Sequence, residues 1–251
     1  MAPWPAFVAL GAVLGALSGL FGVGGSSLAT PALSLLGVPG LMAVASPLPA
    51  TLPTALTAAW PYLRQRNIRP RAALWSLLGA VPAAVIGAML AHLVGGDALL
   101  IASGVVLVVV GIRVLRPVSD RAHRVGEARR KNRPTLVAVS AGVGLFTGLL
   151  ANGGGFLLVP MFLLLFGLTM TQASGTSLAV VAVLAIPATA AHWALGHIDW
   201  SVAAAVALGA APTSAVTATW AQRVTATRLQ AAFGWFLIVS GAAFTLYRLV
   251  I

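Results

Sequence analysis

Residues 15–31 read GALSGLFGVGGSSLATP, and residues 144–160 read GLFTGLLANGGGFLLVP. Both stretches follow the pattern Gly-x3-Gly-x4-Gly-Gly-x5-Pro, at an offset of 129 residues. After a one-residue insertion the offset becomes 130 and persists along the chain, so that Gly79 matches Gly209. The chain is therefore an internal repeat of two halves, and each half opens with an apolar segment that glycines interrupt.

The composition indicates an integral membrane protein. Of the 251 residues, 59% are hydrophobic and 8% are charged, and the mean hydropathy is +0.99. Soluble domains are about 25% charged. The net charge of +11 comes from basic residues between the apolar segments, so we expect the lipid bilayer, and no nucleic acid, as their partner. Because the chain has no cysteine, disulfides and thiolate metal sites are excluded.

Each half of the chain contains four apolar segments. They cover residues 5–36, 41–63, 72–93 and 98–115 in the first half, and 135–166, 171–194, 200–221 and 228–250 in the second. A helix of about 20 apolar residues can cross a bilayer. We therefore predict an all-α polytopic membrane protein with two repeats, residues 1–115 and 135–251, joined by a basic linker at 116–134.

The placement of charge predicts that the two repeats are inverted. Loop 64–71 holds four arginines, whereas its repeat equivalent, loop 194–201, holds no arginine or lysine. The opposite is true of the next pair, because loop 222–228 holds two arginines and its equivalent, loop 94–97, holds only Asp97. Since basic loops stay in the cytoplasm, equivalent loops are expected on opposite sides of the membrane.

Inversion requires an odd number of crossings in each half. A continuous helix over residues 5–36 would be about 48 Å long, against a hydrocarbon core of about 30 Å. We predict that each glycine-broken first segment folds back, as a hairpin or a discontinuous helix, and that three spanning helices follow it. Linker 116–134 is then cytoplasmic. The alternative is eight plain crossings with parallel repeats, which puts loop 222–228 outside.

The glycine breaks are the first candidate binding site. Glycine lets the backbone leave the helix and lets a ligand approach closely. A half-helix that restarts after a break has free N–H groups and a positive dipole end, which together favour an anion. The candidate substrate-binding residues are Gly24, Gly25, Ser26, Ser27, Asn152, Gly153, Gly154 and Gly155. The alternative is close helix packing through small residues, which we expect for Gly15-x3-Gly19 and Gly144-x3-Gly148.

The second segment of each half carries hydroxyl groups. The first half has the run Ser46–Thr51, followed by Pro53, Thr54 and Thr57, and the second half has the run Ser174–Leu178. Three prolines in seven positions predict that the first copy forms no regular helix. Thr176 and Ser177 are candidate donors to an anion. The alternative role of these hydroxyls is to satisfy backbone carbonyls.

His192 is a candidate proton carrier or anion contact, because an ionisable residue at membrane depth is often functional. A structural histidine near the membrane interface is the alternative, given the neighbouring Trp193 and Trp200. The acidic residues all fall outside the apolar segments: Asp97, Asp120, Glu127 and Asp199. This placement disfavours a carboxylate proton relay and a metal site in the membrane, and it favours an anionic substrate. No catalytic set and no cofactor motif is evident, so we do not expect an enzyme.

The paired glycine motif, the run Gly175-Thr176-Ser177-Leu178 and the stretch His192-x3-Gly196-His197-Ile198-x-Trp200 resemble the TauE/SafE sulfite-exporter family, also called the toluene-sulfonate uptake permease family. The resemblance covers about residues 8–248. It implies a bacterial inner-membrane transporter, an exporter, for sulfite, organosulfonates or related sulfur anions. The halves differ at Val23 and Asn152, Ser26 and Gly155, and Pro47 and Ser177, so the two half-sites are expected to be unequal.

Two glycine-broken segments in inverted register are typical of secondary transporters that bind substrate between the repeats and rock one repeat against the other. The expected substrate is a small anion. An anion channel built from the same half-helix ends, or a carrier of another anion such as a carboxylate, is the alternative. The exact anion, the direction of transport, the coupling ion and a possible homo-oligomer are left open by the sequence.

Overall fold

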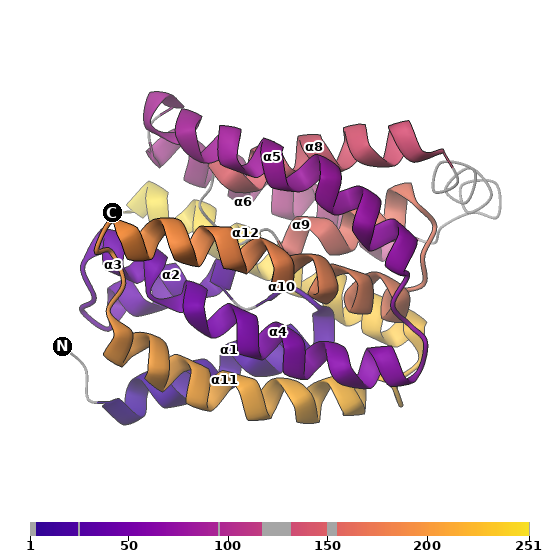
Figure 1. Cartoon of the computed structure of the whole chain (residues 1–251), viewed down its shortest axis with the longest axis horizontal. Coiled ribbons are helices and arrows are strands. Elements are labelled where there is room, and N and C mark those ends of the chain that lie inside the picture. The colour runs from indigo at the N-terminus through magenta and orange to yellow at the C-terminus, as the bar shows by residue number, and fades with distance from the viewer. Residues whose placement is uncertain (1–3, 25, 95, 117–131, 150–154, 251) are drawn as a thin grey trace.

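The computed structural model describes residues 4–24, 26–94, 96–116, 132–149 and 155–250 (Figure 1). All elements in this part of the chain are helices, as predicted. The first half contains α1 (Trp4–Phe21), α2 (Ser26–Leu35), α3 (Gly40–Ala45), α4 (Pro47–Arg64), α5 (Pro70–Val94) and α6 (Gly96–Leu115). The second half contains α8 (Arg133–Leu149), α9 (Gly155–Pro160), a π-helical turn η1 (Met161–Leu165), α10 (Met170–Ala194), α11 (Trp200–Ala221) and α12 (Ala226–Val250).

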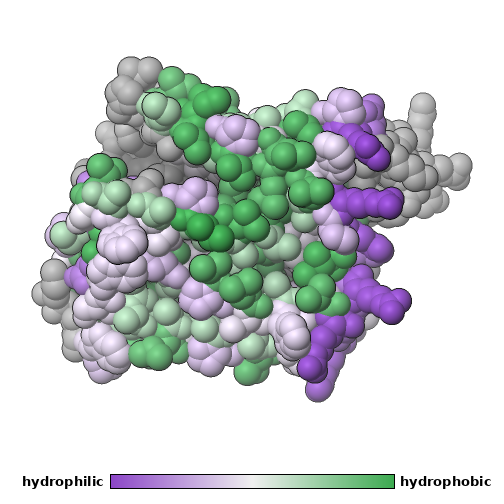
Figure 2. All heavy atoms as spheres, in the orientation of Figure 1, coloured by the Kyte–Doolittle hydropathy of each residue, from purple (hydrophilic) through white to green (hydrophobic). Residues whose placement is uncertain are grey.

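Many large apolar side chains point outward, as expected for a protein whose outer surface meets lipid. Soluble monomers rarely expose contiguous apolar patches of this extent, and Figure 2 shows apolar side chains across the middle of the molecule. The exposed residues include Leu56, Leu74, Val85, Met89, Val109, Ile186, Leu208, Val216 and Val239. Within the described residues, α1, α5, α10 and α11 are long and apolar enough to cross a membrane. The set includes α1, which we did not expect to cross, and omits α4, α6 and α12.

The first glycine-broken segment folds back on itself. Gly22 and Gly24, between α1 and α2, have φ angles of 77° and 78°, in the left-handed region that glycine adopts readily. Leu33 of α2 packs in one buried cluster with Phe7 near the start of α1, so α2 returns along α1. This arrangement fits the hairpin form of the predicted break.

The corresponding segment of the second half also returns. Ser140, in the first half of α8, lies with its Oγ 3.7 Å from the Sδ of Met161, at the start of η1. The chain therefore comes back along α8 after the second break. Residues 150–154, which contain Asn152, Gly153 and Gly154, lie outside the described residues.

The prediction that prolines prevent a regular helix after Ser46 was wrong. The α4 helix begins at Pro47 and runs without interruption to Arg64. Pro47 and Pro49 lie in its first turn, where backbone N–H groups have no partner within the helix and a missing N–H costs nothing. Pro53 and Pro61 lie in the interior of α4, where each removes a backbone hydrogen bond without interrupting the helix.

Each fold-back segment packs on a helix of the other half. Gly15 of α1 lies against Ala210 of α11, where a Cβ would overlap the Ala210 backbone. Gly144 of α8, the repeat equivalent of Gly15, lies in the same way against Ala80 of α5, the repeat equivalent of Ala210. Along both pairs the residue numbers rise together, so the helices are parallel. The glycine pairs therefore have the packing role that we expected.

Helices that match in the repeat run in opposite directions. In α6 and α12, Gly104 lies next to Gly241, and Gly111 lies next to Gly234, so the two helices are antiparallel. The α4 and α10 helices are also antiparallel, because Gly175 near the start of α10 lies against Tyr62 near the end of α4. The matching helices of these two pairs are therefore antiparallel.

A matched pair of hydrogen bonds joins the ends of α4 and α10. The Arg69 N–H donates to the Thr176 Oγ1 at 3.1 Å. At the opposite end, the Asp199 N–H donates to the Ser46 Oγ at 3.0 Å. Both hydroxyls are fully buried, and the two bonds are equivalent at the 130-residue offset. Each half therefore anchors the loop that follows the matching helix of the other half.

Replacing Thr176 with Val is expected to lower the free energy of unfolding by about 1–3 kcal/mol, because the Arg69 N–H loses its acceptor. Ser46→Ala should cost a similar amount, and the double variant should show roughly the sum, because the two sites lie at opposite ends of the bundle. Denaturant unfolding in detergent measures both. Thr219→Val is the control, because the exposed Thr219 hydroxyl bonds only within its own helix. An unchanged free energy of unfolding for Thr176→Val would contradict the assignment.

The arginines of the described loops gather at one end of the bundle. The Asn67 Nδ2 donates to the Gln222 Oε1 at 2.7 Å, which joins the α4–α5 and α11–α12 loops. The end of α6 is tied to the start of α12 by the Gln230 Nε2, which donates to the Val114 carbonyl at 2.8 Å. Figure 2 shows hydrophilic side chains at this end. The basic residues of this end are Arg64, Arg66, Arg69, Arg71, Arg113, Arg116, Arg133, Arg223 and Arg228.

Candidate functional site

The two glycine breaks meet inside the protein. Gly155, the first residue of α9, lies against the carbonyl of Val23, which sits between Gly22 and Gly24. A Cβ at Gly155 would overlap that carbonyl, so only glycine fits. Val23 is 3% exposed. The structure therefore brings together two of the predicted site residues, Gly24 and Gly155, at a buried junction between the halves, which we call the glycine junction (residues 22–24 and 155).

One face of α10 lines the glycine junction. Ser174 lies against Gly22, and its Oγ donates to the Phe21 carbonyl at 3.0 Å. Three residues later, the Ser177 Oγ lies 3.4 Å from the Gly155 carbonyl. Val181 lies against Gly24. This i, i+3, i+7 spacing places the three side chains on the same helix face.

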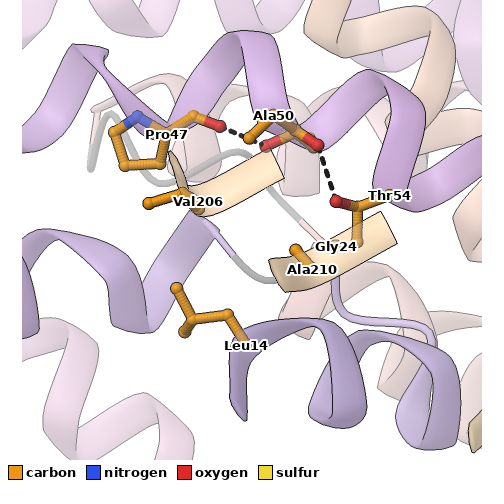
Figure 3. A pocket seen from close by; sticks show the side chains of 8 residues that line it. Leu14, Gly24, Pro47, Ala50, Thr54, Val206 and Ala210 are labelled. Carbon is orange, nitrogen blue, oxygen red and sulfur yellow. Dashed lines mark hydrogen bonds between the residues drawn. The ribbon is translucent and has the colours of Figure 1, made fainter. Parts of the chain in front are cut away.

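A small cavity opens beside Gly24 (Figure 3). It is lined by Leu14, Gly24, Pro47, Ala50, Thr51, Thr54, Val206 and Ala210. Its volume of ≈ 10 Å³, measured as space for the centre of a water-sized sphere, holds about one water molecule. An oxyanion with several heavy atoms does not fit in this cavity.

The hydroxyls of α4 satisfy the backbone in this conformation. Thr51 Oγ1 donates to the Pro47 carbonyl at 3.1 Å, and Thr54 Oγ1 donates to the Ala50 carbonyl at 2.6 Å (Figure 3). A hydroxyl has a single proton to donate, so these groups offer no donor to an anion here. In the first half, these bonds fit the alternative in which the hydroxyls satisfy backbone carbonyls.

The other predicted site residues do not all lie at the junction. Ser177 lies at the junction, whereas Thr176 is bound to the α4–α5 loop through the Arg69 N–H. His192 lies in the last turn of α10, about 22 Å along the helix from Ser177. Ser26 and Ser27 begin α2, and their side chains are outside the described residues, as are Gly25, Asn152, Gly153 and Gly154.

Sequence reasoning missed two buried serines. Ser18 and Ser76 are both fully buried, and their Oγ atoms have no hydrogen-bond partner in the described part of the chain. Ser18 is one helical turn before Gly22, whose N–H donates to the Ser18 carbonyl at 2.8 Å. Ser76 matches Val206 of the cavity wall in the repeat. A lone hydroxyl in an otherwise apolar helix was the available signal.

Comparison with known proteins identifies the family. The family described as "Sulfite exporter TauE/SafE" matches residues 7–244. The chain belongs to the TauE/SafE family.

Similar proteins cover this TauE/SafE protein almost end to end. "Probable membrane transporter protein YjnA" of Bacillus subtilis (strain 168) is 27% identical over 245 residues, which cover 93% of this chain and 96% of YjnA. "Probable membrane transporter protein YunE" of the same organism is 25% identical and covers 81% of this chain and 83% of YunE. A "Probable membrane transporter protein" of Xylella fastidiosa (strain 9a5c) is 26% identical, with 95% and 93% covered. No solved structure matches the chain significantly.

Family, relatives and apolar helices agree on a multi-pass membrane transporter. A transporter acts on a small-molecule substrate in a membrane. These relatives are named as probable membrane transporters. In this TauE/SafE protein both glycine breaks contribute backbone to the buried glycine junction.

Proposed function

We propose that this TauE/SafE protein is a secondary transporter that exports small sulfur oxyanions, such as sulfite or organosulfonates, across the bacterial inner membrane. The observation that carries the proposal is the contact of Gly155 with Val23, where the two glycine breaks meet. No Asp or Glu falls in the apolar segments of the sequence, so no fixed carboxylate opposes an anion there. The family description supports sulfite as the first substrate to test.

The proposed site uses backbone N–H groups at the two breaks, residues 24–26 and 153–155, to hold anion oxygens. Ser177 is the side-chain donor that the geometry favours. Its Oγ lies 3.4 Å from the Gly155 carbonyl oxygen and can turn toward a ligand. Ser27 and Asn152 remain candidate donors in this proposal. Thr176 is less suitable, because its hydroxyl is held by the α4–α5 loop.

The proposed mechanism is alternating access by two inverted repeats. Antiparallel packing of α6 with α12, and of α4 with α10, supports the inversion. The arginine-rich end is assigned to the cytoplasm by the positive-inside rule, together with linker 116–134. Since the glycine junction is buried, a substrate reaches it only when one repeat moves against the other.

The test is anion uptake into proteoliposomes that contain the purified protein. Sulfite, methanesulfonate, sulfate and chloride are compared, with and without a proton gradient. Saturable sulfite or sulfonate flux is the expected result. Chloride flux that does not saturate would instead support the anion channel, and folded protein without any flux of sulfur anions would overturn the proposed substrate class.

A further inference from the structure

A fully buried tyrosine lies between the glycine junction and the arginine-rich end of the bundle. Tyr62 is in the last turn of α4, two residues before Arg64, and its exposed fraction is 0%. Its ring packs on α10 at Gly175, where an added Cβ would be 2.9 Å from the Tyr62 Cβ and 3.1 Å from its Cγ. A side chain at Gly175 would therefore displace the ring.

The Tyr62 hydroxyl is bound to the broken end of α1. The last carbonyls of a helix have no partner within it, and an unsatisfied carbonyl at membrane depth is costly. The Tyr62 Oη donates to the Gly19 carbonyl at 2.9 Å, with the Leu20 carbonyl 3.4 Å away. The next carbonyl, that of Phe21, accepts from the Ser174 Oγ of α10. Two hydroxyls from two other helices thus cap the end of α1 that leads into the glycine junction.

The α4–α5 loop is tied to the same place. The Asn67 N–H donates to the Tyr62 carbonyl at 2.9 Å. Two residues later, the Arg69 N–H donates to the hydroxyl of Thr176, which follows Gly175 in α10. The loop that carries the arginines is therefore held next to the tyrosine ring, on the side away from α1.

The opposite end of the bundle lacks this arrangement. At the offset of 130, the positions of Tyr62, Ser174 and Gly175 are taken by His192, Val44 and Ala45. His192 is only half-buried, and its Nδ1 lies 3.4 Å from the Nδ1 of His197. Valine has no hydroxyl to donate, and alanine has the Cβ that glycine lacks. The bond that anchors the loop is therefore present at both ends, whereas the buried ring is present at one.

We propose that Tyr62 is a gate between the glycine junction and the arginine-rich end, which opens when its hydroxyl leaves the Gly19 carbonyl and its ring leaves Gly175. The inference rests on the proposed transport function and names the residue that controls passage on one side. Gly19 belongs to the first half and Gly175 to the second, so movement of one half against the other separates the ring from one of them. Because the opposite end has no such ring, the two ends are expected to open with unequal probability.

The test uses the absence of cysteine from the chain. A single cysteine, Ser177→Cys, reports access to the junction through its rate of reaction with a membrane-impermeant methanethiosulfonate. The rate is measured from each side, in inside-out vesicles and in spheroplasts, and Arg223→Cys at an exposed position identifies the arginine-rich side. Tyr62→Phe, which removes only the hydroxyl, should raise the rate from that side about three- to tenfold, as expected for an equilibrium that loses one hydrogen bond. The rate from the opposite side should be unchanged or lower.

The ratio of the two rates separates a gate from a general loss of packing, because looser packing raises both rates together. Gly175→Ala, which pushes the ring away, should change the ratio in the same direction as Tyr62→Phe. Thr57→Val is the matched control. It removes an α4 hydroxyl that lies 2.8 Å from the Ser214 Oγ of α11, and it should leave the ratio unchanged.

Each outcome bears on the gate. An unchanged ratio in Tyr62→Phe would overturn the role of the hydroxyl, and an unchanged ratio in Gly175→Ala as well would overturn the gate. Absence of any reaction from the arginine-rich side, in every variant, would overturn it too. A shifted ratio in a protein that moves no sulfur anion would support the gate and overturn the proposed substrate class. Saturable sulfite flux with an unchanged ratio would support the transporter and overturn the gate.

Discussion

Gly155→Ala is expected to reduce sulfite flux to about 1% of wild type or less. The added Cβ would overlap the Val23 carbonyl and its carbon, which are backbone atoms and cannot turn away. The two breaks would therefore separate by about 1 Å, and errors of that size in a binding geometry cost about a hundredfold in rate. The measurement is sulfite uptake into proteoliposomes, normalised to the amount of monodisperse protein recovered.

Gly142→Ala is the control for this result. Gly142 lies in α8, is exposed, and has no atom within 4 Å of the position that a Cβ would take. Alanine should stabilise that helix by about 0.5–1 kcal/mol and leave flux unchanged. Wild-type flux in Gly155→Ala would show that the glycine junction does not need its close contact for transport, and the site would have to be placed elsewhere.

Gly148→Val should be the most destabilising of the helix-packing substitutions. In α8, a Cβ at Gly148 would overlap the carbonyl of Ala84 in α5. Valine adds a Cβ and two methyl groups at that point, so the helices must move apart and lose contacts along their length. Overpacking of a core costs about 1–3 kcal/mol, and we expect a value at the upper limit or above it.

The fall in melting temperature should be about 6–12 °C, given about 2–4 °C per kcal/mol for a chain of this size. Thermal unfolding in detergent, followed by the loss of the monodisperse peak, measures it. Gly142→Val on the same helix is the matched control, since it adds the same side chain at an open position. If both valine variants melt at the same temperature, close packing of α8 on α5 is not a main source of stability.

The positions of the breaks could be predicted from the sequence because glycine doublets in an apolar run have few other uses. The partner of each helix could not. A Gly-x3-Gly stripe indicates a face for close packing, but nothing in Gly15 or Gly144 specifies that α11 and α5 cover these faces. That choice depends on the shape of the whole bundle.

The sequence predicted which residues line the breaks but not which of them lie together. Gly24, Gly155 and Ser177 lie at the glycine junction, whereas Thr176 and His192 make contacts elsewhere. Pro47 and Pro49 lie in the first turn of α4, where proline is favoured, and α4 continues through Pro53, so the predicted break is absent.

The packing of α1 on α11 and of α8 on α5, across the two halves, has a consequence for biosynthesis. The glycine face of α1 is covered by α11, which leaves the ribosome roughly 200 residues after it. At about 5–20 residues per second, α1 waits on the order of 10–40 s for its partner, and α5 waits a shorter time for α8. During that interval the nascent first half holds its most tightly fitting surfaces open to lipid or to insertion factors. Neither half expressed alone should reach a protease-resistant state, because each completes its packing only with helices from the other.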